Sequence, residues 1–352
     1  MLEIWENRFR AVKPLAAGDF LIAEGRLRSQ TRPVGSLGYL EEVVSRYVAI
    51  RGGDAVAGRK RVLIFAGDHG IEREGVSLYP REVTLAMVQN FLNGGATVNA
   101  AARQVGAEVY VFDVGVDGDC PKHPHLGSTK IRRGTRNSLE EPAMTVQELS
   151  QALEIGWNSV ERAAQDGVQF LALGEMGIAN TTAASAIVAA LMKCSPSFVT
   201  GRGTGLDEAS LARKVQVIER ILQKHTGQIE DPFSVLRCLG GYEIAALAGA
   251  VLSACHYRIP TLVDGWIVTA AVLICARLNP AILDYLIFAH CSDEKGHQFV
   301  LKELGVRPLL QLSMRLGEAS GAVLAMGLVD TGLRIYREVA TFAEAGVAES
   351  RQ

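Results

Sequence analysis

The stretch Val168-Gln-Phe-Leu-Ala-Leu-Gly-Glu-Met-Gly-Ile-Ala-Asn-Thr-Thr182 decides the fold class. It begins as an apolar run of strand length and leaves that run through two glycines. It then reaches an asparagine and two threonines, residue types that satisfy the free N–H groups at the start of a helix. A buried strand, a tight turn and a helix in direct succession form the repeating unit of a parallel sheet. We therefore expect an α/β protein.

The same alternation of short β-branched runs and longer helix-like segments extends in both directions from this stretch. The expected strands are Val62–Phe65, Glu108–Val114, Val168–Leu173, Thr261–Val263 and Leu283–Phe288. The clearest helix candidates are Val146–Ala164, Leu206–Lys224 and Glu243–Cys255. Strands that alternate with helices predict a mainly parallel, Rossmann-like sheet in three layers, with helices on both faces.

The 352 residues are expected to form one unit, residues 1–352, with two parts. Residues 60–300 contain the strand-like runs and predict a large α/β core. Residues 1–59 and 301–352 have helical patterns without a clear strand, so the two ends of the chain predict a small helical subdomain beside that core. The long polar stretch from Asp117 to Met144 is the best candidate for a mobile loop.

Composition narrows the functional class. The formal net charge is −2, so the chain offers no basic field to hold a nucleic acid backbone. The most apolar segments fall short of the roughly 20 residues that a membrane-spanning helix needs, and the first residues do not have the pattern of a signal peptide. The six cysteines are scattered without a C-x-x-C pair, as in a reduced cytoplasmic protein.

Five apolar runs end in an acid next to glycine or another small residue. These acids are Asp68, Asp113, Glu175, Asp264 and Asp293. Ligands of open parallel sheets bind in the crevice at the carboxyl ends of the strands, so the acids could converge on one site. Each acid could equally cap the helix that follows it. Both interpretations remain open for any single acid, although the capping interpretation is weaker for all five together.

Two glycine-containing turns are candidates for anion binding. Gly174 to Thr182 combines bare backbone N–H groups with hydroxyls at a helix start, which favours an anion. Thr200 to Gly205 resembles a phosphate loop, but it is neither G-x-G-x-x-G nor a Walker A sequence. A dinucleotide or ATP site therefore has little support, and Thr200 to Gly205 could be a plain loop.

Two histidine-containing segments collect potential metal ligands. The run His290 to His297 lacks the H-E-x-x-H spacing that places two histidines on one face of a helix. In the segment Cys120 to His125, prolines stand between the potential ligands. A simpler interpretation of the first segment makes Ser292 a helix cap. We expect no metal at either segment.

Glu318 stands within a mostly apolar stretch, Met314 to Ala325. Burial would raise the pKa of its carboxyl and make it a usable general base near neutral pH. A helix that starts just after Gly317 would lower the same pKa. The sequence leaves both directions open, as well as a purely structural role.

Taken together, these motifs resemble the nicotinate-nucleotide:dimethylbenzimidazole phosphoribosyltransferase family. The blocks that carry the resemblance are, in order, Pro33–Gly38, Gly67–Gly70, Glu74–Ser77, Asn90–Ala96, Asp113–Val116, Gly174–Thr182, Gly201–Asp207, Gly240–Glu243, Val263–Gly265, His290–His297 and Met314–Ala322. The chain departs from the family mildly, with Ala319 in place of a usual glycine and with Tyr242 and Trp266 where phenylalanine is common. We expect Ala319 to stiffen the backbone only slightly.

The resemblance implies a doubly wound α/β core, a small helical subdomain from both termini and a homodimer. It also implies transfer of ribose 5-phosphate from nicotinate mononucleotide to 5,6-dimethylbenzimidazole, which gives α-ribazole 5′-phosphate and nicotinate without a metal or other cofactor. Adenine or a phenol is the alternative acceptor, because sequence alone does not set the acceptor. A nucleotide-binding sensor without catalysis is the alternative from another class, and an oxidoreductase is disfavoured.

Residue roles follow from the same resemblance. Glu318 matches the proposed general base of the family, and Glu175 matches a family residue that lies beside the nucleotide. The family residues near the phosphate correspond to Gly177, Lys214 and Ser292 of this chain. The family residues near the aromatic base correspond to Ser77, Tyr79, Pro80 and Gln89. The further substrate-binding candidates are Gly174, Asn180, Thr181, Gly203, Asp264, Leu316 and Gly317.

Overall fold

A single parallel sheet organises the protein, which we describe from a computed structural model covering residues 2–203 and 205–348. Its strands are β1 (Arg59–Gly67), β2 (Ala107–Gly115), β3 (Leu126–Ser128), β4 (Val168–Met176), β5 (Thr261–Val263) and β6 (Leu286–Phe288). They lie in the order β3-β2-β1-β4-β5-β6, and every neighbouring pair is parallel. This is the doubly wound order, in which the chain reverses direction across the sheet between β1 and β4.

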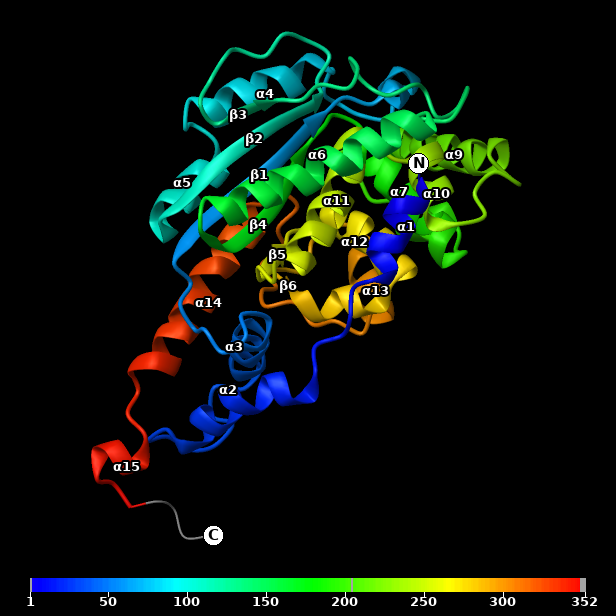
Figure 1. Cartoon of the computed structure of the whole chain (residues 1–352). Coiled ribbons are helices and arrows are strands. Elements are labelled where there is room, and N and C mark those ends of the chain that lie inside the picture. Colours follow the sequence, from blue (N-terminus) through cyan, green and yellow to red (C-terminus); the bar gives the residue numbers. More distant parts are fainter. Residues whose placement is uncertain (1, 204, 349–352) are drawn as a thin grey trace.

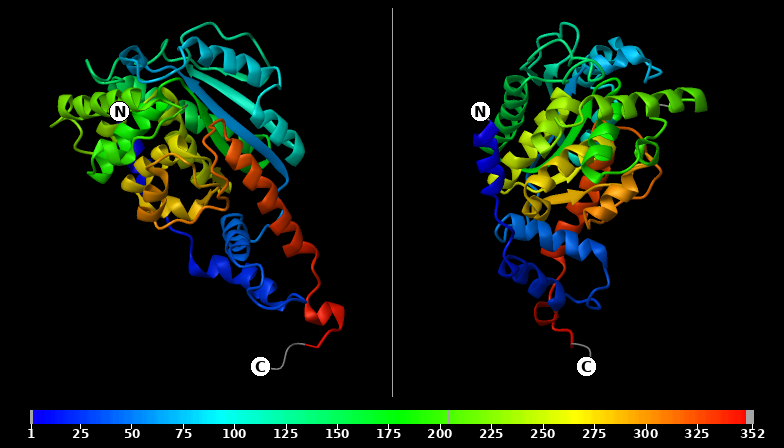
Figure 2. Two further views of the ribbon diagram at one scale, coloured as in Figure 1. Left: turned by 180° about the vertical axis from the view of Figure 1, so that it is seen from behind. Right: turned by 90° about the vertical axis from the view of Figure 1, so that its right-hand side faces the viewer.

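Helices cover both faces of the sheet (Figures 1 and 2). One face packs against α6 (Val146–Gln165), α11 (Tyr242–His256) and α12 (Trp266–Leu278), and the other against α4 (Glu82–Leu92), α5 (Thr97–Val105) and α14 (Ser320–Glu338). Alternate residues of β1 serve the two layers, because successive side chains of a strand point to opposite faces. Leu63 and Phe65 belong to the core on the α11 side, whereas Val62 and Ile64 belong to the core on the α14 side.

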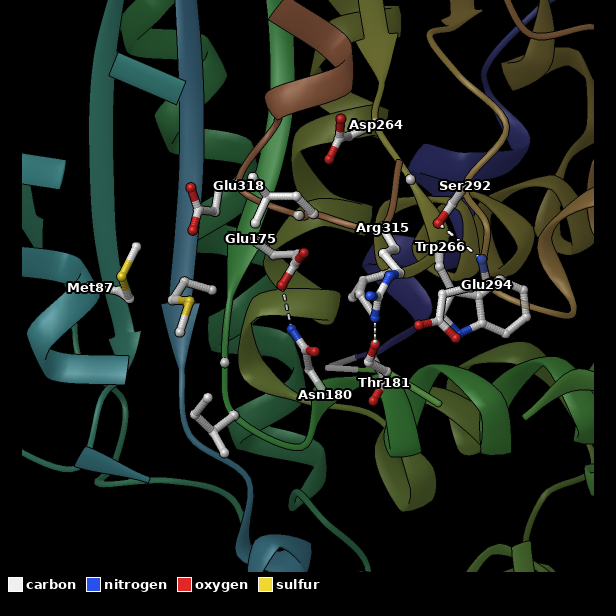
Figure 3. Close-up of a pocket in the computed structure, with 18 of the residues that line it drawn as sticks. Met87, Glu175, Asn180, Thr181, Asp264, Trp266, Ser292, Glu294, Arg315 and Glu318 are labelled. Atoms are coloured by element: carbon white, nitrogen blue, oxygen red, sulfur yellow. Dashed lines mark hydrogen bonds between the residues drawn. The ribbon is translucent and has the colours of Figure 1, made fainter. Parts of the chain in front are cut away.

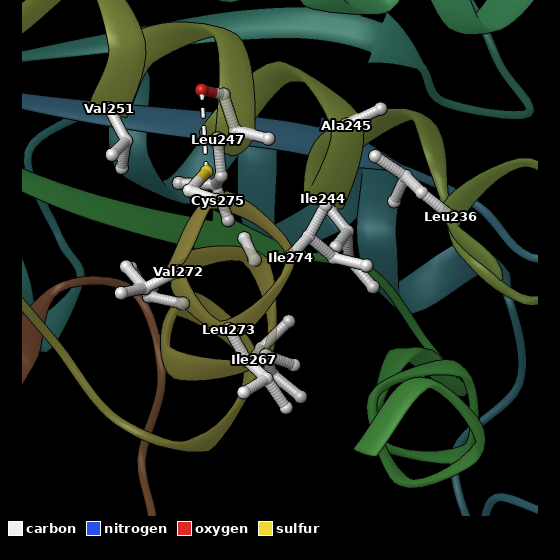
Figure 4. Packing of buried hydrophobic residues seen from close by; sticks show 14 of the residues in the cluster. Leu236, Ile244, Ala245, Leu247, Val251, Ile267, Val272, Leu273, Ile274 and Cys275 are labelled. Carbon is white, nitrogen blue, oxygen red and sulfur yellow. Dashed lines mark hydrogen bonds between the residues drawn. The ribbon is translucent and has the colours of Figure 1, made fainter. Parts of the chain in front are cut away.

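The thickest part of the core lies around α11. Apolar side chains of α10 (Pro232–Leu239), α11 and α12 interdigitate there, and nearly all are fully buried (Figure 4). Gly156 of α6 and Gly249 of α11 let these two helices approach backbone to backbone. A β-carbon at Gly156 would lie 1.8 Å from the Ala246 oxygen, and one at Gly249 would lie 2.0 Å from the Leu153 oxygen.

The remaining elements connect these layers. They are α1 (Leu2–Arg10), α2 (Ala17–Ser29), α3 (Tyr39–Ile50), the 3₁₀ turn η1 (Gly70–Glu74), α7 (Asn180–Met192), α8 (Pro196–Val199), α9 (Glu208–Lys224), the 3₁₀ turn η2 (Pro280–Tyr285), α13 (His297–Glu303) and α15 (Phe342–Ala345). No helix within the described residues is long and apolar enough to cross a membrane. The six cysteines all lie in the described part of the chain, and each is a free thiol.

The terminal helices are distributed over two places. α2 and α15 lie together away from the sheet, and α14 runs from the sheet to reach them (Figures 1 and 2). α3 packs against both α2 and the sheet, where the Tyr47 ring lies 5.2 Å from that of Phe170 in β4. α1 instead packs against α6 and α12. The division into a core of 60–300 and a subdomain of 1–59 and 301–352 therefore stays a prediction, and α14 belongs to both parts by its contacts.

The structure confirms the expected α/β class and corrects two details. The predicted strand Leu283–Phe288 is shorter, because Pro280 opens a 3₁₀ turn whose N–H at Ala281 is capped by Asn279, and only β6 remains extended. β3 was not predicted, since Leu126-Gly-Ser128 has no apolar run and forms an edge strand through pairing with β2 alone. β3 lies inside the polar stretch 117–144, whose mobility stays a prediction. Thr204, within the loop 200–205, lies outside the described residues.

Candidate active site

A cavity of about 620 Å³ opens at the carboxyl ends of β4 and β5, next to the reversal point of the sheet (Figure 3). This volume is within the usual range for small-molecule sites. The lining residues are Tyr79, Val83, Met87, Glu175, Met176, Gly177, Ile178, Asn180, Thr181, Gly203, Asp264, Gly265, Trp266, Ile267, Ser292, Glu294, Arg315, Leu316, Gly317 and Glu318. Three of them are buried carboxylic acids, which makes the electrostatics of the cavity unusual.

Glu175 is fixed at the end of β4, where parallel pairing with Phe65 of β1 sets its position. Its side chain is only 6% exposed, and the Asn180 side-chain amide donates a hydrogen bond to its Oε2. Burial, followed by the negative charge of Glu243, raises the pKa of Glu175 to about 8, and the Asn180 hydrogen bond opposes this rise. A β-carbon at Gly317 would lie 2.3 Å from the Glu175 Oε1, so a larger residue there would displace this carboxyl.

Glu318 lies in the turn that leads into α14. Glu318 and Ala319 both adopt left-handed backbone conformations, with φ of 68° and 66°. The turn packs directly onto β4, where a β-carbon at Gly174 would lie 2.4 Å from the Ala319 nitrogen. Such conformations cost roughly 1–2 kcal/mol for a residue other than glycine. The expectation that Ala319 stiffens the backbone only slightly is therefore wrong, because this position needs a conformation that favours glycine.

Burial decides the direction of the Glu318 pKa. The side chain is 7% exposed, and within the described part of the chain its Oε2 has no hydrogen-bond partner. Burial, supported by the negative charge of Asp264, raises the pKa of Glu318 to about 7. Helix α14 starts two residues later, at Ser320.

Asp264 follows β5 and is almost completely buried. Its Oδ1 accepts a hydrogen bond of 2.8 Å from the N–H of Ala322, in the first turn of α14. Burial raises the pKa of Asp264, whereas nearby His290 and backbone N–H groups lower it. Glu175, Glu318 and Asp264 thus form a group of acids that oppose one another's ionisation.

The other end of the cavity carries both signs of charge, because Arg315 and Glu294 line it together. Thr181 and Gly203 meet there, because a β-carbon at Gly203 would lie 3.3 Å from the Thr181 Oγ1, and Arg315 donates to the Gly203 oxygen at 3.4 Å. Ser292 is held by its own N–H, which donates to His297 Nδ1 at 2.7 Å. The Nδ1 of His297 is therefore an acceptor, and burial lowers the pKa of this imidazole to about 3.

Lys214, on α9, reaches the same end from behind. It does not line the cavity, but its Nζ donates to Thr181 Oγ1 at 2.7 Å, and a β-carbon at Gly203 would lie 3.5 Å from that Nζ. The side chain is buried, which lowers the pKa of Lys214 to about 8 against the opposing charge of Glu294. Gly174 also lies just outside the cavity, beneath the Glu318 turn.

Apolar side chains form a third part of the cavity, where the resemblance places the aromatic base. Val83 and Met87 of α4 face it one helical turn apart, together with Tyr79, which is 49% exposed. Ser77, Pro80 and Gln89 are not among the lining residues. Ser77 accepts a hydrogen bond from the Tyr79 N–H, and Gln89 lies on the exposed side of α4.

The five acids at strand ends do not all converge. Glu175 and Asp264 line the cavity, but Asp68, Asp113 and Asp293 do not. Asp68 accepts the Asp117 N–H at 2.7 Å, and Asp113 accepts the Val116 N–H at 2.9 Å, so both fix backbone after their strands. Neither acid caps a following helix, so their role is structural but differs from the expected capping.

Sequence reasoning did not name nine of the lining residues as site residues. They are Val83, Met87, Met176, Ile178, Gly265, Trp266, Ile267, Glu294 and Arg315. The i, i+4 spacing of Val83 and Met87 was the one signal available for the apolar part. Trp266 was noted only as a departure from the family. Its indole lines the cavity, and its Nε1 has no partner among the residues that the structure describes.

The fold and the cavity define an α/β enzyme that holds a nucleotide-sized ligand beside buried carboxyls. The sequence matches the family described as Phosphoribosyltransferase over residues 18–347. It is 48% identical to a nicotinate-nucleotide–dimethylbenzimidazole phosphoribosyltransferase of Geobacter metallireducens, over 97% of each chain. It is 50% identical to the enzyme of the same name from Chloroflexus aggregans, over 92% of each chain.

Solved structures agree with the sequence comparison. The crystal structure of CobT from Thermus thermophilus superposes with a TM-score of 0.90 at 45% identity, and the match covers 95% of this chain and 100% of that one. The chain therefore belongs to the phosphoribosyltransferase family.

Proposed function

We propose that this enzyme transfers ribose 5-phosphate from nicotinate mononucleotide to 5,6-dimethylbenzimidazole, forming α-ribazole 5′-phosphate and nicotinate. The observation that carries the proposal is Glu318, a buried carboxyl whose Oε2 has no hydrogen-bond partner among the described residues, and which faces the cavity with a pKa raised to about 7. The names of the relatives support the same substrates.

The reaction exchanges one carbon–nitrogen bond for another. One nitrogen of the benzimidazole attacks C1′ of the ribose while the bond from C1′ to the pyridinium nitrogen breaks. The bonding electrons pass to that ring nitrogen, so nicotinate leaves with a neutral pyridine ring and needs no acid. Attack opposite the departing ring inverts the β linkage to α. The second benzimidazole nitrogen loses its proton to Glu318, which balances the charge.

Glu175 has a different role in this proposal. Positive charge grows on the ribose as the old bond lengthens, and a carboxylate beside it would stabilise that charge. The pKa of Glu175 is raised to about 8, but a cationic pyridinium ring beside it would favour its ionised form. Asn180 holds the carboxyl in place through its hydrogen bond to Oε2.

We assign the 5′-phosphate to the end of the cavity at Gly177, Gly203 and Ser292. Lys214 supplies positive charge there through Thr181, and Arg315 lines the same end. The remaining substrate-binding candidates at this end and beside the ribose are Gly174, Asn180, Thr181, Asp264, Leu316 and Gly317.

We assign the aromatic acceptor to the apolar part, between Tyr79 and the side chains of Val83 and Met87. Ser77 would act by holding the Tyr79 backbone, and Pro80 by shaping the same turn. Gln89 lies outside the cavity and would reach the acceptor only through a movement of α4. The chemistry needs no metal or redox cofactor, and we propose that the enzyme works as a cytoplasmic homodimer on small molecules alone.

Product analysis tests the proposal. The purified enzyme would be incubated with nicotinate mononucleotide and a panel of acceptors that includes 5,6-dimethylbenzimidazole, adenine and a phenol. Mass spectrometry should detect α-ribazole 5′-phosphate and nicotinate in equal amounts, with 5,6-dimethylbenzimidazole the preferred acceptor by kcat/KM. Preferential transfer to adenine or a phenol would reassign the acceptor. Binding of the mononucleotide without turnover would show that the protein binds nucleotides but is not an enzyme.

A further inference from the structure

His290 is a buried histidine that the reaction described above does not use. It follows β6, is 1% exposed and is not one of the residues that line the cavity. Neither ring nitrogen has a hydrogen-bond partner among the described residues. A buried polar ring without partners costs free energy, so this position calls for an explanation.

The ring is enclosed by two glycines, of which Gly265 lines the cavity and Gly321 lies behind it in α14. A β-carbon at Gly321 would lie 2.1 Å from the His290 Cδ2, and one at Gly265 would lie 3.1 Å from its Nε2. Gly321 is in the first turn of α14, and Gly265 directly follows Asp264. The imidazole therefore fills the space between the end of β5 and the start of α14.

The same ring approaches Asp264, which connects it to α14 a second time. His290 Nε2 lies 3.6 Å from Asp264 Oδ1, and that oxygen accepts the Ala322 N–H at 2.8 Å. His290 thus touches α14 directly at Gly321 and through Asp264 at Ala322. Both contacts lie within four residues of Glu318, on the helix whose start fixes the Glu318 turn.

The Glu318 turn needs such support. Glu318 and Ala319 hold left-handed conformations that are unfavourable for both residues, and such strain persists only where the surroundings determine it. β4 supports the turn from one side through Gly174. We propose that His290 is a positioning residue that, through Asp264 and Gly321, holds the first turn of α14 and thereby fixes the Glu318 carboxyl beside the acceptor.

The inference rests on the proposed role of Glu318 as proton acceptor. Its consequence is a specific pattern in the kinetics. A carboxyl that is displaced by about 1 Å loses on the order of 100-fold in rate, whereas the distant phosphate contacts remain. Loss of His290 should therefore lower kcat and leave KM for nicotinate mononucleotide nearly unchanged.

Three variants test this pattern. Glutamine places an amide nitrogen near the position of the histidine Nε2, so His290→Gln keeps a donor within reach of Asp264. The asparagine side chain is too short, and leucine has no donor. We expect His290→Asn and His290→Leu to lose roughly 10- to 100-fold in kcat per folded molecule, with KM for the mononucleotide within about threefold of the wild-type value. We expect His290→Gln to recover most of kcat.

His225→Gln is the matched control, because His225 is also fully buried but hydrogen bonds the Ser138 oxygen away from the cavity. It should lower the melting temperature without changing kcat. Either His290→Leu or His290→Asn suffices if the other fails to fold. Wild-type kcat in the folded variants, or a raised KM at unchanged kcat, would overturn the inference. A wild-type enzyme without turnover would instead overturn the proposed function.

Discussion

At the scale of single residues, the site contains three acids whose pKa values the fold raises. Glu175, Glu318 and Asp264 each have a raised pKa, mainly because burial removes water from the carboxyl. A base must be unprotonated to accept a proton, and its affinity for the proton rises with its pKa, so a pKa near the working pH is the best compromise between the two. The raised pKa of Glu318 is therefore the property that suits it to general-base catalysis.

This property predicts the pH dependence of the reaction. The Glu318 carboxyl is protonated and inactive well below its pKa of about 7 and ionised above it. We expect kcat/KM for the acceptor to rise about tenfold per pH unit in the acid range and to level off near pH 7. Steady-state rates between pH 5 and 9 check this. A plateau that already extends down to pH 5 would mean that a group with an ordinary carboxyl pKa controls the reaction.

The same burial predicts a cost in stability at Glu175. Its pKa is 4.5 in the unfolded chain and about 8 in the folded protein, so both states are protonated below pH 4.5 and folding carries no cost there. As the pH rises from 4.5 to about 8, Glu175 ionises in the unfolded chain but stays protonated in the folded protein, so the free energy of unfolding falls over this range. We expect Glu175→Gln to raise the melting temperature clearly at pH 8 and little at pH 5.

The control for this change is Glu154→Gln, an exposed glutamate on α6, which should change the free energy of unfolding by less than about 0.5 kcal/mol at either pH. Equal stabilisation by Glu175→Gln at both pH values would show that packing, and not ionisation, explains its effect.

At the scale of elements, the existence and type of the long strands and helices were more predictable than their bounds, since β4 continues three residues beyond its predicted end at Leu173. Thr261–Val263 was predicted with its observed bounds, because Pro260 precedes this short apolar run and Asp264-Gly265 follows it. Val146–Ala164 differs from α6 by one residue, because its helical pattern is long and periodic. β3 was missed because an edge strand of three residues gains its extended form from pairing with β2. The left-handed turn at Glu318 was also missed, since it depends on packing against Gly174, far away in the sequence.

Helix α9 carries a second prediction at this scale. Lys214 contacts Thr181 and approaches Gly203, so it supports the proposed phosphate end without touching the base or the ribose. Loss of one charged contact should cost on the order of 1.5–3 kcal/mol of binding free energy. We expect Lys214→Ala to raise KM for nicotinate mononucleotide about tenfold or more, with a smaller change in kcat.

Lys224, the exposed last residue of the same helix, provides the matched control. Lys224→Ala removes the same charge from α9 and should leave KM unchanged. A collapsed kcat at wild-type KM in Lys214→Ala would place Lys214 in the chemical step instead of at the phosphate.

At the scale of the whole molecule, the sequence predicted the sheet and the chemistry better than the shape of the cavity. The parallel sheet with helices on both faces follows from strands that alternate with helices, and the family resemblance implied its doubly wound order. Glu175 and Asp264 follow from acids at strand ends. Lining residues such as Ile178 and Arg315 come from loops. Their placement depends on tertiary packing, which no local pattern encodes.

The oligomeric state is a whole-molecule prediction. Several large apolar side chains are exposed on the helices of the two termini, among them Leu21 and Ile22 on α2 and Leu324 and Leu328 on α14. Exposed apolar surface of this kind favours association. We expect light scattering at micromolar concentration to give twice the 37.8 kDa mass of one chain. A mass of 37.8 kDa at that concentration would exclude the homodimer.

The central claim is that Glu318 accepts the proton from the attacking base, and Glu318→Gln tests it most directly. Glutamine keeps the size and hydrogen bonding of the side chain but does not take up a proton. We predict that kcat falls about 10²- to 10⁴-fold while KM for nicotinate mononucleotide barely changes. Glu338→Gln, at the exposed far end of α14, should behave as wild type. Turnover of Glu318→Gln within a few-fold of wild type would contradict the account and leave Glu175 as the carboxyl to test.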